Sequence, residues 1–332
     1  MKLFKVRETH KFCNNIDDSK SFYVNMKNVG KMLAVVILTK NSGRTIESTL
    51  NGLLESSYLP NEIIIVDGGS QDNTIDSVKR FSDKLNIKIV YDEGKGLGYA
   101  RDIGWRKTSE HIKYVAMVDS DVIVEKNFFI EAIKILEEDK KLGALGAKLK
   151  PACDEKGILA KFQTKNLSIH LHWREKPYPN EIIAIHTACT IFRKRALQEV
   201  GGFDHYFKLA KEDSDISFRI RKIGYKLSYI DCYAKHLETG KRFWKINFRY
   251  GRSYVHISEK HPVEGKLWTK KNVIFTISLF LFPLELLIWF YYLSRYARLE
   301  DLNFQETLTL SLVETLRQII RTFGMLYELL HL

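Results

Sequence analysis

The chain has 332 residues and carries 52 Lys and Arg against 40 Asp and Glu, a formal net charge of +12 that suits nucleic acid, an anionic membrane surface or a phosphorylated substrate. Its hydrophobic fraction of 45% is that of a globular protein and excludes wholesale disorder, collagen and coiled coil. Four Cys residues, far apart and without a C-x-x-C pair, exclude a disulfide scaffold, disfavour a structural zinc site and indicate a reducing compartment.

The first elements expected along the chain are a loose arm followed by alternating strands and helices. Residues 1–31 are polar, have no sustained period and lack the apolar segment of a signal peptide. Four strands are expected at Leu33–Leu38, Glu62–Val66, Ile87–Val90 and Tyr114–Val118, and the first is a continuous apolar run typical of a strand covered on both faces. Helical spacing between them predicts right-handed βαβ units and an α/β fold with a mostly parallel, Rossmann-like sheet flanked by helices.

The middle of the chain is more mixed. We expect short strands at Ile182–Ile185 and Leu227–Ile230, and helices at Ala196–Val200 and Ser214–Ile223. Ligands of such sheets bind at the carboxyl ends of the strands, which is where the acidic clusters of this sequence fall.

The last part of the chain, 241–332, differs in kind. Basic and aromatic residues are interleaved over 241–254, and Val273–Leu293 is nearly all apolar apart from an interruption at Pro283 and Glu285. About 20 apolar residues can cross a bilayer. The pattern predicts a helical, membrane-associated appendage. It leaves open a span or re-entrant helix, an in-plane interfacial helix, or a soluble core or dimer helix.

Two acidic clusters end predicted strands. Asp119 and Asp121 follow the fourth strand, where two carboxylates are costly unless a cation compensates them, so they predict Mg²⁺ or Mn²⁺ with a diphosphate. The alternative is a solvated loop or a helix N-cap. Asp67 ends the second strand and could accept hydrogen bonds from a nucleobase or ribose, although an Asp-Gly turn explains it equally simply.

Two further segments have a chemical and a structural interpretation. Lys211–Asp215 precedes an apolar helix, so its carboxylates either cap that helix or hold a general base towards the pocket. The Gly-rich loop Glu93–Gly98 leads to Arg101 and could bring backbone N–H groups towards phosphates, but alone it is a weak signal.

In this order and spacing, the segments resemble family 2 glycosyltransferases with the GT-A fold over residues 32–240. The segments that carry the resemblance are VVILTKNSGRTIESTLNGLLESS, EIIIVDGGSQDNT, GLGYARDIG, VDSDV, and GGFD followed by KEDSDISFRIRKIGYK. Two departures concern donor contacts: the turn has Asp-Gly where many members have two aspartates, and the loop has Arg-Asp where Arg-Asn is common.

The resemblance implies a donor site. Thr39 and Asp67 would contact the donor base, Arg101 would lie near the ribose or diphosphate, and Asp119 would touch the nucleotide ribose. The expected donor is a nucleoside-diphosphate sugar.

The resemblance also implies a metal and a base. Asp121, with Asp119, would ligate Mg²⁺ or Mn²⁺, and His236 stands where some relatives place a further metal or phosphate contact. Asp213 would deprotonate the acceptor hydroxyl, with Glu212 beside it.

Together these features predict an inverting, metal-dependent glycosyltransferase in glycan or glycolipid assembly. The apolar C-terminal region suggests an acceptor linked to a lipid such as a polyprenyl phosphate, and a place on the cytoplasmic face of the cell membrane. A nucleotide-sugar pyrophosphorylase is the first rival, but TKNSGRTIES after the first strand lacks its Gly-rich basic loop. A nucleic-acid-binding protein is the second, without a supporting motif. The sugar, the base, the acceptor and a homo-oligomeric state remain open.

Overall fold

The computed structural model describes residues 32–151, 157–163, 165, 178–237, 242–265, 273, 276, 282–299 and 302–331. The arm expected over 1–31 and much of the first half of the apolar segment Val273–Leu293 lie outside these residues.

The described part of the chain forms one eight-stranded sheet in the order β3-β2-β1-β4-β7-β6-β8-β5. The strands are β1 (Leu33–Thr39), β2 (Glu62–Asp67), β3 (Ile87–Tyr91), β4 (Tyr114–Asp119), β5 (Val122–Val124), β6 (Leu142–Pro151), β7 (Cys189–Arg193) and β8 (Lys226–His236). From β3 to β4 all neighbours are parallel, as predicted. Beyond β4 the sheet is mixed, because β7 runs antiparallel to β4 and β6, and β5 runs antiparallel to β8.

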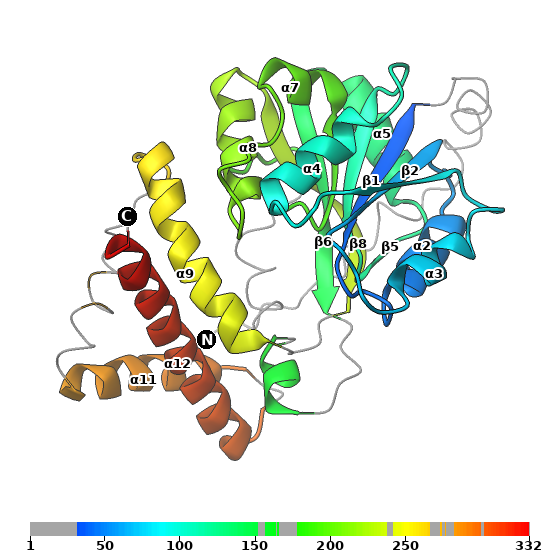
Figure 1. Cartoon of the computed structure of the whole chain (residues 1–332). Coiled ribbons are helices and arrows are strands. Elements are labelled where there is room, and N and C mark those ends of the chain that lie inside the picture. Colours follow the sequence, from blue (N-terminus) through cyan, green and yellow to red (C-terminus); the bar gives the residue numbers. More distant parts are fainter. Residues whose placement is uncertain are drawn as a thin grey trace, which may run out of the picture.

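Helices cover both faces of this sheet (Figure 1). Those of the α/β body are α2 (Ile46–Leu54), α3 (Thr74–Lys79), α4 (Leu97–Arg106), α5 (Phe128–Glu138), α7 (Lys194–Glu199) and α8 (Glu212–Lys222). Side chains of α2, α3 and α5 join one core, and those of α4, α7 and α8 join the other. The resulting three layers are those of an α/β fold.

The two cores follow from the alternation of side chains along each strand. In β1, Leu33, Val35 and Ile37 enter the first core, whereas Ala34 and Val36 enter the second. All five are fully buried, which explains why the strand is continuously apolar. Each large aliphatic side chain buried in this way stabilises the fold by about 1.5–3 kcal/mol.

The strand expected at Ile182–Ile185 is wrong. Ile182 N donates to Leu227 O of β8 at 3.0 Å, and Tyr178 N, which precedes the segment, donates to Tyr229 O at 2.6 Å. The segment forms no regular ladder in the sheet, although Ile185 is buried in the second core. Of the four residues only Ile185 is buried and Ile183 is 62% exposed, so this apolar run marks neither a strand nor a continuously buried segment.

The remaining described helices lie to one side of the α/β body (Figure 1). They include α9 (Phe243–Lys260), α11 (Phe282–Tyr296) and α12 (Phe304–Leu329). α12 packs on both α9 and α11. The C-terminal end of α9 contacts the body, where Ile257 packs with Phe207 and Phe218 and where His261 Nε2 lies 2.8 Å from Asp215 Oδ1. Among the described helices, none has the length and apolar character needed to cross a membrane.

Candidate active site

The carboxyl edge of the parallel strands gathers several of the predicted residues. In the register of the sheet, Thr39 of β1 pairs with Asp67 of β2, and Leu38 of β1 pairs with Asp119 of β4. Asp67, Thr39 and Asp119 therefore lie along one edge, where α/β sheets bind their ligands.

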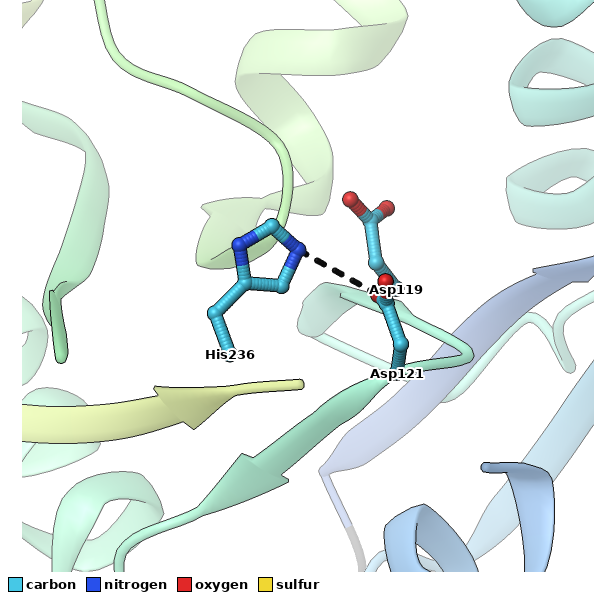
Figure 2. Close-up of side chains that lie close together, drawn as sticks. All are labelled: Asp119, Asp121 and His236. Atoms are coloured by element: carbon cyan, nitrogen blue, oxygen red, sulfur yellow. Dashed lines mark ion pairs between the residues drawn. The ribbon is translucent and has the colours of Figure 1, made fainter. Parts of the chain in front are cut away.

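Asp119, Asp121 and His236 come together at this edge (Figure 2). β5 begins directly after Asp121 and pairs Val122 with His236 at the end of β8, so the antiparallel ladder brings the imidazole to the carboxylates. One ligand atom from each of the three residues lies within 4.8 Å of the others, and His236 Nε2 is 3.3 Å from Asp121 Oδ1. Two carboxylates and an imidazole form a donor set that fits Mn²⁺ or Mg²⁺.

Arg101 of α4 links this cluster to the start of α8. Its guanidinium donates from Nη2 to Asp119 Oδ1 at 3.1 Å and from Nε to Glu212 Oε1 at 3.0 Å. Burial tends to lower the pKa of Arg101, but Asp119 and Glu212 outweigh it and raise the pKa. The arginine expected near the donor phosphates is 4% exposed and holds two carboxylates in place.

Glu212 and Asp213 open α8 but have different surroundings. Glu212 is buried against Arg101, and burial raises its pKa, an effect that Arg101 opposes and Asp213 reinforces. Asp213 is only partly buried, and its Oδ1 accepts from the backbone N–H of Ser214 at 2.6 Å. Asp213 lies in the first turn of α8. Of the two predicted acids, Asp213 is the one that a substrate can reach.

His186 is a residue of this site that the sequence reasoning missed. Burial lowers its pKa to about 4, against the influence of Asp213 and Asp119, which favour the charged form. His236 adds to the lowering. The imidazole is therefore neutral near pH 7 and lies in the electrostatic field of both acidic groups. A single His within HTACT carries no motif that could have identified it.

Asp67 organises the turn that follows β2. Its carboxylate accepts from Thr39 Oγ1 at 2.9 Å, from Ser70 N at 2.8 Å and from Gly69 N at 3.0 Å. The side chain is 1% exposed. The Asx-turn interpretation thus describes the contacts in this structure, and the donor-base role of Thr39 and Asp67 stays a prediction.

The Gly-rich loop before α4 serves close packing. Leu97 N donates to Lys208 O at 3.0 Å and Gly98 N donates to Phe207 O at 2.9 Å. A Cβ on Gly98 would lie 2.0 Å from Asp204 O. These two amides are used within the protein, so the loop positions α4 and Arg101 against the segment that leads to Asp213.

Asp102 of α4 links that helix to the GGFD turn at residues 201–204. Its Oδ1 accepts from the N–H of Phe203 at 3.1 Å and from Trp105 Nε1 at 2.8 Å. A Cβ on Gly202, whose φ is +86°, would meet the same oxygen at 2.1 Å. The Asp that replaces the more common Asn therefore ties the GGFD turn to α4.

Comparison with known proteins identifies the family to which the chain belongs. The family described as Glycosyl transferase family 2 matches residues 34–201. Poly-beta-1,6-N-acetyl-D-glucosamine synthase of Staphylococcus aureus strain COL is 28% identical over 218 residues, which are 64% of this chain and 52% of that protein. The chain thus spans about half the length of the curated relatives it matches.

Solved structures share the fold. The mannosyltransferase PcManGT from Pyrobaculum calidifontis, solved with GDP-Man and Mn²⁺, has a TM-score of 0.61 at 17% identity and covers 93% of this chain and 94% of its own. GalNAc-T7, solved with UDP, GalNAc and Mn²⁺, has a TM-score of 0.52 at 17% identity and covers 84% of this chain and 53% of its own. The sheet, the acidic edge and the match over 34–201 agree: the chain belongs to glycosyl transferase family 2.

Proposed function

We propose that this chain transfers a sugar from a nucleoside-diphosphate sugar to a hydroxyl group, with inversion at the anomeric carbon and with a divalent cation. The observation that carries this proposal is the convergence of Asp119, Asp121 and His236 at the carboxyl edge of the sheet. Arg101 connects this cluster to Glu212 and thus to the start of α8, where Asp213 lies.

The donor class is supported by what the similar proteins are named and solved with. One relative is a poly-beta-1,6-N-acetyl-D-glucosamine synthase, and two structures of similar fold hold GDP-Man or UDP together with Mn²⁺. We extend a nucleoside-diphosphate sugar from these proteins to this chain.

Asp119, Asp121 and His236 would hold the cation. When bound, Mg²⁺ or Mn²⁺ would neutralise negative charge on the leaving diphosphate. Arg101 donates from Nε to Glu212 and from Nη2 to Asp119, and so keeps Asp119 in its orientation.

Asp213 would take the proton of the acceptor hydroxyl as its oxygen attacks the anomeric carbon. The carbon–oxygen bond to the acceptor forms while the bond to the diphosphate oxygen breaks. A retaining route would need a carboxylate nucleophile on the other face of the sugar. Glu212, the nearest candidate in the described sequence, is buried in its pair with Arg101, which favours the single inverting displacement.

We further propose that the acceptor is linked to a lipid, such as a polyprenyl phosphate, and that the enzyme works at the cytoplasmic face of the cell membrane in glycan or glycolipid assembly. The basic balance of the C-terminal region supports this, because residues 241–332 contain 13 Lys and Arg against 8 Asp and Glu.

The experiment is a donor panel. Purified full-length protein is incubated with UDP-GlcNAc, GDP-mannose or dTDP-glucose, with Mn²⁺, with Mg²⁺ or with EDTA, and released nucleoside diphosphate is measured. We expect release from one donor, and a loss of at least about 100-fold in EDTA. Release of pyrophosphate from a sugar phosphate and a nucleoside triphosphate, in place of donor turnover, would support the pyrophosphorylase alternative.

A further inference from the structure

The polarity of α12 is inverted relative to a helix of a water-soluble domain. Its buried side chains include these polar residues: Thr307, Ser311, Glu314, Thr315, Arg317, Gln318, Thr322 and Glu328. Its exposed side chains include these apolar ones: Leu312, Leu316, Phe323, Tyr327 and Leu329. A helix packed on a soluble core normally turns its apolar stripe inwards.

Several inward polar side chains of α12 are hydrogen-bonded within the helical unit. Glu314 Oε1 accepts from Arg317 Nη2 at 2.7 Å and from Gln318 Nε2 at 2.6 Å. Arg321 Nε donates across to Asn247 Oδ1 of α9 at 2.8 Å. Such internal satisfaction is what a helix needs where water does not reach its polar groups.

Glycines bring α9 and α12 unusually close. A Cβ on Gly251 of α9 would lie 2.0 Å from Arg321 O, and a Cβ on Gly324 of α12 would lie 2.1 Å from Phe248 O. Small residues that allow backbones to approach, together with interhelical hydrogen bonds, are typical of helices that associate in lipid.

The apolar side continues onto α11. Leu286, Leu287, Phe290 and Tyr291 are between 45% and 64% exposed, whereas Ile288 and Tyr292 of the same helix are buried. We call the exposed apolar residues of α11 and α12 the outer face. Figure 1 shows these two helices away from the sheet, with α9 between α12 and the body. The outer face mixes aliphatic and aromatic side chains, which suits the boundary between lipid headgroups and acyl chains.

We propose that the outer face of α11 and α12 docks in the plane of an anionic phospholipid bilayer. We expect an interfacial depth, because the outer face mixes aliphatic and aromatic side chains. The excess of basic over acidic residues in 241–332 complements an anionic surface. This inference rests on the proposed function, because docking on a membrane would bring the active site to a lipid-linked acceptor.

A second copy of the chain is a weaker occupant for the same face. A dimer seam in water would need only the apolar stripe, and the buried polar network behind it would remain a cost. A lipid surface accounts for the apolar exterior and for the glycine-packed, hydrogen-bonded interior together.

Vesicle flotation tests the proposal with the full-length chain. Vesicles of phosphatidylcholine alone are compared with vesicles that also contain phosphatidylglycerol. The face variant combines Leu312→Ser, Leu316→Ser and Phe323→Ser, at side chains that are 40% to 52% exposed. The matched control combines Leu59→Ser, Ile183→Ser and Ile223→Ser, which are 46% to 62% exposed elsewhere.

We expect the wild type and the control to float with anionic vesicles, and the face variant to lose at least about tenfold in partition. Equal flotation of the face variant and the wild type would overturn the proposal. So would a wild type that binds neither vesicle but is a dimer by light scattering and becomes a monomer in the face variant. Donor hydrolysis separates the two proposals: vesicle binding without hydrolysis by the wild type would remove the proposed function alone.

Discussion

The α/β body and the helical unit formed by α9, α11 and α12 differ in the kind of side chain that they bury. In the body, β1 places aliphatic side chains on both faces of the sheet, and the cluster of Asp119, Asp121 and His236 lies at its carboxyl edge. In the helical unit, Glu314, Arg317 and Gln318 face inwards while Leu312 and Leu316 face outwards. This difference is the basis of our proposal that the outer face of the helices contacts lipid.

The largest effect is expected at the acidic edge of the body. Asp213→Asn removes the proposed base while keeping the shape of the side chain, so transfer should fall by about 10²–10⁴-fold. Donor binding, measured by calorimetry, should stay within a factor of about two. Asp83→Asn, at an exposed acidic residue, is the control. Transfer at the wild-type rate by Asp213→Asn would remove the base from the mechanism.

The second effect concerns the stability of the body. Arg101→Met leaves Asp119 and Glu212 without their shared cation, and breaking a buried ion pair from one side costs about 3–5 kcal/mol. Urea denaturation measures the free energy of unfolding. Arg106→Met, which also removes an Arg–Asp pair but at a half-exposed guanidinium, should cost about 1 kcal/mol or less. An equal decrease in the free energy of unfolding in both variants would show that the buried Arg101 ion pairs stabilise the fold no more than the half-exposed Arg106 pair does.

The third effect is a pH dependence at His186. Its pKa is lowered to about 4, so the folded protein resists a proton that the unfolded chain takes up at a pKa of about 6.5. The free energy of unfolding should therefore fall as the pH drops from about 6.5 towards 4, by up to about 3 kcal/mol.

His186→Asn isolates that contribution. In EDTA, the variant should lose less stability than the wild type over this pH range, whereas His111→Asn at an exposed position should behave as the wild type. Parallel pH profiles for the wild type and His186→Asn would contradict the burial of a neutral imidazole beside the acids.

The smallest effect tests the close packing of the helical unit. Gly324→Ala places a Cβ against Phe248 O, so α9 and α12 must separate, at a cost of about 1–3 kcal/mol. Phe323→Ala, one residue away on the outer face, should cost less than about 0.5 kcal/mol in detergent. Hydrogen exchange of α12 measures both. A larger loss of protection in Phe323→Ala would reverse the assignment of inside and outside.

The first half of the fold was predictable because its strands are short, mostly apolar runs that alternate with segments of helical spacing. The prediction is confirmed for β1 to β4 and their parallel order. β6 escaped notice because Gly143, Gly146 and Lys148 interrupt its apolar character. Those glycines are explained only in the folded protein, where a Cβ on Gly146 would lie 2.8 Å from the Tyr229 ring.

The candidate site was predictable in part and for a different reason. Asp119 and Asp121 stand out because they end a buried strand, but their contact with His236 depends on β8 pairing with β5. Only the resemblance to a family linked these residues in advance. His186 and the double role of Arg101 depend on long-range packing, which no local pattern contains.

For α12 the sequence gives the period of its apolar stripe, with Leu312, Leu316 and Phe323 on one side, but does not say which side is covered. That depends on the groups presented by α9, such as Asn247, which bonds Arg321. Which side of α12 is buried therefore depends on tertiary packing and not on the sequence of the helix alone.

The cation site is tested most directly by thermal unfolding of the wild type and Asp121→Asn with UDP or GDP, in the presence and absence of Mn²⁺. For the wild type, a nucleoside diphosphate should raise the melting temperature only when Mn²⁺ is present, because Asp119, Asp121 and His236 then share the cation with the phosphates. Asp121→Asn should lose this Mn²⁺-dependent shift. An equal Mn²⁺-dependent shift in Asp121→Asn would contradict the assignment of the metal to this edge of the sheet.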